Sequence, residues 1–272
     1  MGKSLSKLLK KRDLFMLFEF SLTAYQKLCL SLMELKRPII RFDELFSQKY
    51  DASSPYIILR HDVDRWPLNA LEMAKLESDL GIRSTYYFRF IPSVFKKEII
   101  SKISEMGHEI GYHYETLSKA KGDPYKAIKI FKTELSELRS IAPIKTACMH
   151  GSPLSKFDNR IIWKHFNLQD YGILGEPYLS LNYNEIEYFT DTGRSWNETR
   201  TNLRDRTNQV KDKNSVSIQG IDDLITLFKK TDKPIILQTH PERWNQRTDR
   251  YLAYLLFDYM ANGIKLALSF VR

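Results

Sequence analysis

Cysteine is scarce in this sequence, with only Cys29 and Cys148 among 272 residues. Two cysteines are too few for a disulfide-stapled secreted scaffold, and reduced thiols fit a protein of the cytoplasm. A cleavable signal peptide is not expected, because the apolar stretch that begins at Leu14 lacks a cleavage site of small residues. We therefore expect a cytoplasmic protein.

Interruptions are also lacking: the chain has no internal repeat, no low-complexity segment and no long Gly/Ser linker. Its length suffices for one large α/β domain with a full core or for two small ones. Hydrophobic residues make up 43% and charged residues 28%, which is ordinary for a soluble globular protein. Composition therefore predicts a globular domain, which we place at residues 51–272.

Negative charge is in deficit, because the formal net charge is +9. Nucleic acid, an anionic glycan or a membrane surface would each suit a basic protein, and a solvated basic surface would serve solubility alone. No string of mixed basic and aromatic residues supports nucleic-acid recognition, so no nucleic-acid partner is expected. The densest basic group lies at the N-terminus: Lys3, Lys7, Lys10, Lys11 and Arg12.

An apolar stretch follows this basic group, at residues 14–35. A membrane-spanning helix would place Gln26 and Lys27 near the bilayer centre, where polar groups are costly. An amphipathic helix that packs on the domain is the favoured interpretation. The alternative is a basic helix on a membrane surface, which would make the protein membrane-peripheral. Residues 1–50 are thus predicted to form an N-terminal helical extension.

Short apolar runs alternate with helical periods from about residue 55 onward. Strands are predicted at 56–59, 85–90, 109–114, 145–149 and 234–238, with weaker candidates at 170–174 and 187–190. Helices are predicted from Pro67 to Gly81, from about Val94 to Met106, from Asp123, from near Asp158 and through 250–261.

This alternation implies βαβ units and a parallel sheet. No predicted strand is followed by a glycine-rich nucleotide turn, which favours a barrel over a doubly wound sheet. The predicted fold class is α/β: a distorted or incomplete (β/α) barrel, seven-stranded and TIM-like.

Acidic and histidine side chains collect where the predicted strands end, and the carboxyl ends of barrel strands are where catalytic groups lie. Alternate residues of a strand share one face, so Asp62 and Asp64 can point together after the first strand. The other residues at strand ends are His113, Glu115, His150 and His240. Four strands would thus direct carboxylates and imidazoles toward one rim.

Three nitrogen or oxygen ligands with an open position are typical of a catalytic zinc, which lowers the pKa of bound water. A neighbouring carboxylate can then act as base, and a histidine can protonate the leaving group. His165 within a predicted helix and His108 before its strand have structural interpretations instead. Cys148 shares a face with His150, but a buried packing thiol is the favoured interpretation.

Three strings resemble the polysaccharide deacetylases of carbohydrate esterase family 4: RHDVD at 60–64, GHEIGYHYE at 107–115 and THPERW at 239–244. The resemblance covers residue 56 to the C-terminus. It is greatest to a bacterial branch often associated with surface-polysaccharide gene clusters. That branch shows strings like MHGSPLSKFDNR (149–160), LGEPYLSLN (174–182) and TDTGRSWN (190–197). The resemblance implies a distorted (β/α) barrel that removes N- or O-acetyl groups from sugars with zinc or a similar divalent ion.

The resemblance also implies roles for single residues. Asp62 resembles the catalytic base, Asp64 the metal-binding aspartate and His113 the first of two metal-binding histidines. The second histidine of the family is missing, because position 117 is leucine. His150 is the best replacement, since it lies at the end of the next strand, and Glu115 is the runner-up. The general acid of the family resembles His240.

Further residues are candidates for contact with substrate. Asp191, Arg194 and Trp196 fall in a glycine-containing loop and are predicted to form a sugar-binding wall, because aromatic faces stack on sugar rings and arginine pairs with anionic substituents. The alternative is that Trp196 and Trp244 are core or lid residues. Asn159 and Arg160 are equally ambiguous, because they also start a helix. Arg60 is predicted to share the carboxylate face and to hold Asp62 ionised.

The predicted function is therefore hydrolysis of an acyl group, acetyl being favoured, from an amino sugar or glycan intermediate. Zinc is the favoured metal, although an Asp/His site also accepts iron, cobalt or nickel. Asp62 would take the proton of the attacking water, and His240 would protonate the departing amine or alcohol. The alternative, motivated by Leu117, is a protein of the same fold that binds a glycan without turning it over. The partner in both cases is a carbohydrate.

Overall fold

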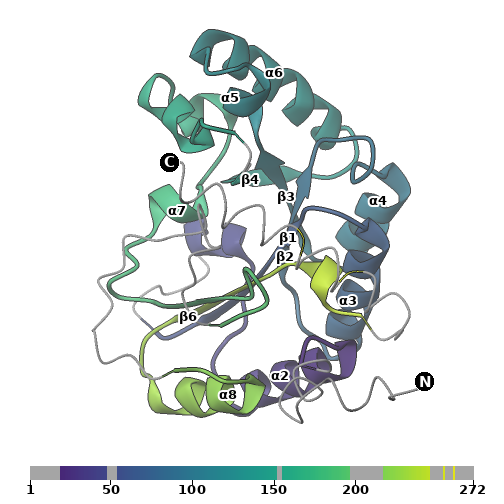
Figure 1. The fold of residues 1–272 in the computed structure, drawn as a ribbon, viewed down its shortest axis with the longest axis vertical. Coiled ribbons are helices and arrows are strands. Elements are labelled where there is room, and N and C mark those ends of the chain that lie inside the picture. Colours follow the sequence, from purple (N-terminus) through teal and green to yellow (C-terminus); the bar gives the residue numbers. More distant parts are fainter. Residues whose placement is uncertain are drawn as a thin grey trace, which may run out of the picture.

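A computed structural model describes residues 19–47, 54–151, 155–196 and 217–245, together with Tyr254 and Met260. Six strands of this part of the chain form one sheet in the order β4-β3-β2-β1-β6-β5, and every neighbouring pair is parallel. Helices surround the sheet (Figure 1). The prediction of a parallel α/β sheet is thus confirmed.

The strands are β1 (Ile57–Val63), β2 (Thr85–Arg89), β3 (Glu109–Tyr114), β4 (Ile144–Met149), β5 (Glu187–Thr190) and β6 (Ile235–Thr239). They overlap six of the seven predicted strands. The seventh prediction, at 170–174, is wrong. The chain there forms the short 3-10 helix η4 (Leu168–Tyr171), and the left-handed Gly172 that follows breaks any extended run. Only an isolated parallel bridge joins Gly175 to Thr146, so β4 and β5 are the edges of the described sheet.

Local signals place the helices that follow the first three strands. Helix α3 (Pro67–Asp79) has proline at its first position, and Gly81 with φ 73° follows its end. Helix α4 (Lys97–Glu105) is followed by Gly107 with φ 89°. Helix α6 (Pro124–Arg139) is capped by the Asp123 carboxylate, which accepts the N–H groups of the first turn.

Seven further helical elements lie within the described residues. They are α2 (Leu22–Glu34), η2 (Phe42–Phe46), α5 (Thr116–Lys119), η3 (Asn159–Lys164), α7 (Pro177–Ser180), α8 (Ile221–Lys230) and η5 (Pro241–Arg243). The helix predicted near Asp158 is thus the 3-10 helix η3. The one predicted through 250–261 lies outside the described residues, apart from Tyr254 and Met260.

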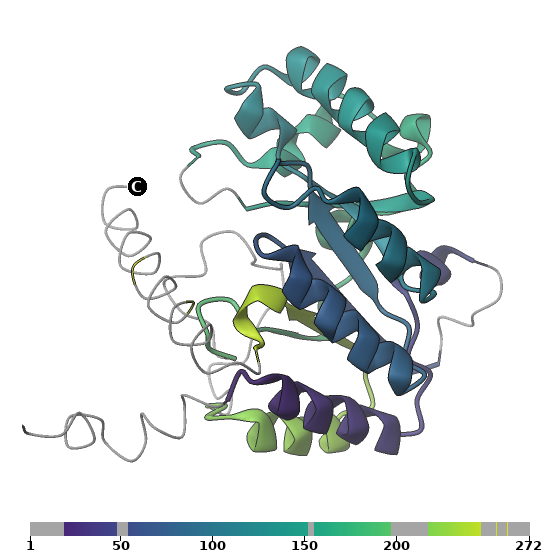
Figure 2. The ribbon, with the colours of Figure 1, turned by 90° about the vertical axis from the view of Figure 1, so that its right-hand side faces the viewer.

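Helix α2 lies beside α8 and α3 in both ribbon views (Figure 2). Ser21 caps it, and Tyr25, Leu28, Cys29 and Leu32 form its buried face. The basic group of residues 3–12, and with it the predicted membrane contact, lies outside the described residues. Among the helices that are described, none is both long and apolar enough to cross a bilayer.

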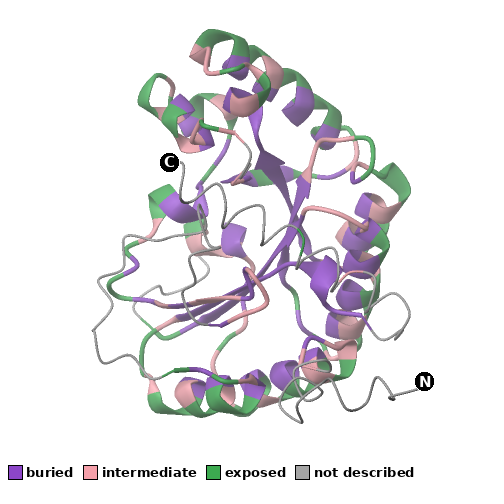
Figure 3. Ribbon diagram, viewed as in Figure 1, coloured by how far each residue is buried: buried purple, intermediate pink, exposed green. Residues whose placement is uncertain are grey.

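Both faces of the sheet are buried, as Figure 3 shows for the strands at its centre. Every residue of β1 is buried, the polar Arg60, His61 and Asp62 among them, as expected for a strand covered on both faces. Ile57 and Leu59 pack on the side of α2 and α8, whereas Ile58 packs in the other core cluster. By the same alternation, His61 belongs to the α2 side and Arg60 and Asp62 to the opposite side.

Candidate active site

The carboxyl ends of β1, β3, β4 and β6 carry the side chains that the sequence singled out. Asp62 lies near the end of β1 and Asp64 directly after it, His113 lies near the end of β3, and His150 and His240 follow β4 and β6. All six strands are parallel, so these ends lie along one edge of the sheet. Ligands bind at this edge in open α/β sheets.

Asp64 lies close to both His113 and His150. Asp64 Oδ1 lies 3.4 Å from His113 Nε2 and 3.5 Å from His150 Nε2. The two imidazole rings are 5.2 Å apart between centroids and inclined by 74°. Tetrahedral ligands at zinc distances would be separated by about 3.3 Å. The measured separations from the carboxylate oxygen are therefore those that a small divalent ion would need.

The hydrogen bonds of both histidines favour metal binding through Nε2. His113 Nδ1 lies 3.0 Å from the carbonyl oxygen of Cys148, and His150 Nδ1 lies 2.9 Å from Glu115 Oε2. Each of these oxygens accepts a hydrogen bond from Nδ1–H, so Nε2 is the ring nitrogen that faces Asp64. Buried Asp64 Oδ1 has no hydrogen-bond partner among the described residues. A buried, unsatisfied carboxylate oxygen is costly unless a cation compensates it. Asp64 and the two histidines are therefore candidate ligands for a divalent metal.

Glu115, the runner-up for the missing metal ligand, lies beside His150 in the structure. Its carboxylate contacts His150 Nδ1 on one side and the Arg89 guanidinium on the other, at 2.9 Å in each case. Burial would raise the pKa of Glu115, but His150 and Arg89 lower it to about 2. The Glu115 carboxylate thus joins His150 to Arg89, and its prediction as a substrate-binding residue stays a prediction.

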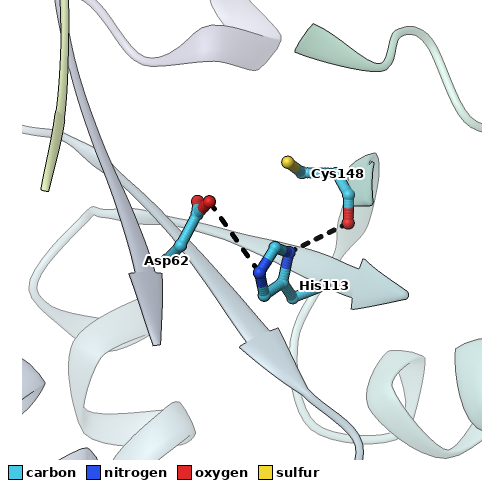
Figure 4. Close-up of side chains that lie close together, drawn as sticks. All are labelled: Asp62, His113 and Cys148. Carbon is cyan, nitrogen blue, oxygen red and sulfur yellow. Dashed lines mark hydrogen bonds and ion pairs between the residues drawn. The ribbon is translucent and has the colours of Figure 1, made fainter. Parts of the chain in front are cut away.

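A second set of possible metal-binding atoms lies deeper and shares His113. Asp62, His113 and Cys148 offer ligand atoms that all lie within 4.8 Å of one another (Figure 4). Here Asp62 Oδ2 is 3.8 Å from His113 Nε2, farther than Asp64 is. Both oxygens of Asp62 are also hydrogen-bonded, and a neighbouring arginine repels a cation. The strand ends thus offer two overlapping sets of possible metal ligands, which share His113.

Asp62 is a buried carboxylate held by two fixed donors. Arg60 donates through Nε at 3.0 Å and Nη2 at 2.7 Å, and Gln238 Nε2 donates at 2.6 Å. Burial would raise the pKa of Asp62, but Arg60 and His113 outweigh it and lower the pKa below its usual value. Arg60 is fully buried and contacts Asp62, as expected for a residue that keeps the carboxylate ionised.

His240 forms a dyad with Asp191. His240 Nδ1 lies 2.6 Å from Asp191 Oδ1, and Asp191 Oδ2 accepts hydrogen bonds from the His240 main chain and from Trp244 Nε1. Burial and Arg243 lower the pKa of His240, but Asp191 raises it and the net shift is upward. Asp191 therefore favours the protonated imidazole, which can donate a proton.

Two residues of the predicted sugar-binding wall, Asp191 and Trp196, are buried in the structure. Asp191 is fully buried, and Trp196 is 6% exposed and packs near Phe20 and Trp244 in the core. The Arg194 guanidinium lies over the Phe20 ring. Asp191 thus supports His240, and the tryptophans fill the core because their rings find apolar neighbours there.

Two other histidines have the positions expected of structural residues. His108 is buried, with Nε2 3.0 Å from the Ala74 carbonyl oxygen, and His165 is exposed at the end of η3.

Asn159 and Arg160, which the sequence left ambiguous, both form hydrogen bonds within the protein. Asn159 donates to the His150 carbonyl oxygen, and Arg160 pairs with Asp158.

Sequence reasoning missed Arg89 and Gln238. Both lie at or near strand ends, Arg89 as the last residue of β2 and Gln238 two positions before His240. Their place at the strand ends would have identified both residues, but only acidic and histidine side chains at strand ends were considered as candidates.

The comparisons with known proteins yield likenesses of fold only. No family model matches the chain, and no curated protein matches it. One similar solved structure is a mutant of a CE4 family pseudoenzyme with restored enzymatic activity. It is 10% identical with a TM-score of 0.40, over 77% of this chain and 64% of that one. Another is the CE4 domain of a multidomain xylanase from the hindgut metagenome of Trinervitermes trinervoides. It is 12% identical with a TM-score of 0.40, over 77% of this chain and 85% of that one. This chain thus spans less than two thirds of the first protein, and likeness at this level transfers no residue roles.

Proposed function

We propose that this protein is a metal-dependent deacylase of the polysaccharide deacetylase type, which removes an acetyl group from an amino sugar or glycan intermediate. One observation carries the proposal: the buried Asp64 Oδ1, which forms no hydrogen bond with the described residues, lies 3.4 and 3.5 Å from the Nε2 atoms of His113 and His150. These residues would hold the metal, with zinc the first choice. A divalent ion bound there would polarise an acyl carbonyl and lower the pKa of a water molecule.

Asp62 is the proposed general base. Its carboxylate is ionised, and its Oδ2 lies 3.8 Å from His113 Nε2, which places it beside the metal-binding residues. Hydrogen bonds from Arg60 and Gln238 fix the orientation of this carboxylate. Oδ2 accepts from both Arg60 Nη2 and Gln238 Nε2, whereas Oδ1 accepts only from Arg60 Nε, so Oδ1 keeps a lone pair that can accept a proton from water.

His240 is the proposed general acid. Asp191 holds its Nδ1 and favours the charged imidazole, so Nε2 carries the proton that a departing amine or alcohol needs. Base and acid come from adjacent strands, since β1 and β6 pair directly. Two residues with opposite protonation states at one strand edge are the arrangement that acyl hydrolysis requires.

The test is acetate release from chitooligosaccharides and from acetylated xylan, which separates amide from ester hydrolysis. Asp62→Asn should lower kcat by about 100-fold or more while the zinc content stays unchanged. Asp64→Asn should lose both zinc and activity. Asp79→Asn, an exposed change at the end of α3, is the matched control and should behave as the wild type. A purified wild type that neither binds zinc nor releases acetate from either substrate contradicts the proposal.

The second candidate is a glycan-binding protein of the same fold without turnover. It is motivated by Leu117, which is buried in the core where the resemblance places a histidine. Isothermal titration with the same oligosaccharides in the presence of a chelator distinguishes the two. Binding that ignores the chelator, together with no acetate release, favours the second candidate, and steady acetate release excludes it.

A further inference from the structure

We propose that Arg89 is a positioning residue that organises two of the three metal-binding residues, Asp64 through its main chain and His150 through Glu115. This inference rests on the proposed metal centre of Asp64, His113 and His150. Nothing in the sequence motifs assigns Arg89 a role. It ends β2, the strand that lies between β1 and β3 in the sheet.

The guanidinium of Arg89 reaches to both sides of its own strand. On the β1 side, Nη1 donates to the carbonyl oxygen of Asp64 at 3.3 Å. On the β3 side, Nη2 donates to both oxygens of Glu115, at 3.0 and 2.9 Å, and Nε lies 3.3 Å from Oε1. Arginine suits this position because its planar fork presents several donors in a fixed geometry.

Glu115 transmits this order to the His150 ring. The main chain of His150 is already fixed, because its N–H donates to the Tyr114 carbonyl oxygen and its own carbonyl oxygen accepts from Asn159. The ring can still rotate about its side-chain bonds. The 2.9 Å contact between Nδ1 and Glu115 Oε2 sets the ring orientation and turns Nε2 toward Asp64. Arg89 in turn holds the Glu115 carboxylate in the plane that this contact needs.

Electrostatics and positioning predict opposite results when Arg89 is replaced. A guanidinium near a divalent cation repels it, so an Arg89 that only balanced charge would weaken metal binding, and its removal would tighten it. An Arg89 that orders Asp64 and His150 strengthens binding, and its removal weakens it. The sign of the change in zinc affinity therefore separates the two roles.

The experiment measures the Kd for Zn²⁺ by competition with a chelator of known affinity, using the full chain. Arg89→Met is expected to raise the Kd by about 10- to 100-fold, the range seen when a partner of a metal-binding residue is lost. The Co²⁺-loaded variant should also show an altered visible absorption spectrum, because the ligand geometry changes. Arg139→Met is the matched control, since Arg139 also donates to main-chain carbonyls, those of Ile144 and Gly172, outside the site. Its Kd should equal that of the wild type.

Arg89→Lys is a second variant that tests the same role if Arg89→Met does not fold. Lysine keeps the charge but cannot contact Glu115 and the Asp64 carbonyl oxygen with one rigid fork. Positioning therefore predicts a weaker Zn²⁺ affinity for Arg89→Lys, and charge balance predicts no change. Unchanged or tighter binding in these variants overturns the role of Arg89 and leaves the metal centre standing. A wild type that does not bind Zn²⁺ overturns the metal centre itself.

Discussion

Glu109 begins β3, at the end of the sheet opposite to the candidate active site, and only 5% of its surface is exposed. Its carboxyl group accepts hydrogen bonds from the hydroxyl groups of Thr85 and Thr146 and from the main chain of Asp43. Burial and the charge of Asp43 nevertheless raise the pKa of Glu109 to about 7. Ionisation of Glu109 at high pH is therefore less favourable in the folded protein than in the unfolded chain, which lowers the stability.

We predict that Glu109→Gln flattens the pH dependence of stability. The pKa of Glu109 in the folded protein, about 7, lies above the ordinary value of 4.5. Its contribution is thus fully favourable below pH 4.5 and is lost as the pH rises through 7, at a cost of at most about 3 kcal/mol. Glutamine keeps the shape and stays neutral, so urea denaturation should show a more stable variant at pH 8 and equal stability at pH 4.5. Glu105→Gln, an exposed change on α4, is the control. A variant that loses stability at pH 8 contradicts the prediction.

At the scale of elements, one buried carboxylate joins α2, α3, β1 and β2. Glu77 of α3 accepts hydrogen bonds from Tyr25 of α2, from Ser84 just before β2 and from Tyr86 of β2, and it contacts His61 of β1 at 2.9 Å. Burial would raise the pKa of Glu77, but His61 and the other donors lower it to about 2. The other ring nitrogen of His61 lies 2.7 Å from Thr239 Oγ1 on β6. The network thus connects β1 to β6 through His61 and Thr239, the neighbours of Asp62 and His240 in the sequence.

Glu77→Leu should destabilise the protein by about 3–5 kcal/mol at pH 7, because it leaves several buried donors without an acceptor. The folded pKa of Glu77 is below the ordinary value of 4.5, so its contribution is present above pH 4.5 and disappears as the pH falls toward 2. The loss should therefore shrink in acid, which chemical denaturation at pH 7 and pH 3 can measure. Glu72→Leu, on the exposed side of the same helix, should change stability by about 0.5 kcal/mol or less. A loss that is equal at both pH values contradicts the assigned role.

Local signals made most elements predictable from the sequence. Pro67, Asp123 with Pro124, and the glycines at 81 and 107 mark helix ends through conformations that depend on near neighbours only. The 170–174 segment misled because its apolar residues resemble a strand, while the conformation is decided by the left-handed Gly172.

The burial of Asp191 could not be read from the sequence, because it depends on contacts with residues 240–244, about fifty positions along the chain. Likewise, Arg89 acquires its partners only when β2 is inserted between β1 and β3. Strand-end residues were thus predictable as a group, but their partners follow from the strand order.

At the scale of the whole molecule, the proposed metal would join distant parts of the sheet. Asp64 follows β1, His113 belongs to β3 and His150 follows β4, while β2 lies between β1 and β3. A bound ion would therefore cross-link most of one half of the sheet. Because the unfolded chain does not bring these residues together, binding should favour the folded state alone.

Zinc should therefore raise the thermal unfolding midpoint of the whole protein. At a free zinc concentration 100 times the Kd, the stabilisation is about 2.7 kcal/mol, which for a chain of this size is about 5–10 °C. Thermal scans with zinc and with a chelator measure the difference. Asp64→Asn should abolish most of it, because Asp64 Oδ1 is the atom that contacts both imidazoles. His165→Ala removes an exposed histidine at the end of η3 and should keep the full shift. The same zinc-dependent shift in Asp64→Asn and in the wild type would mean that the ion binds elsewhere.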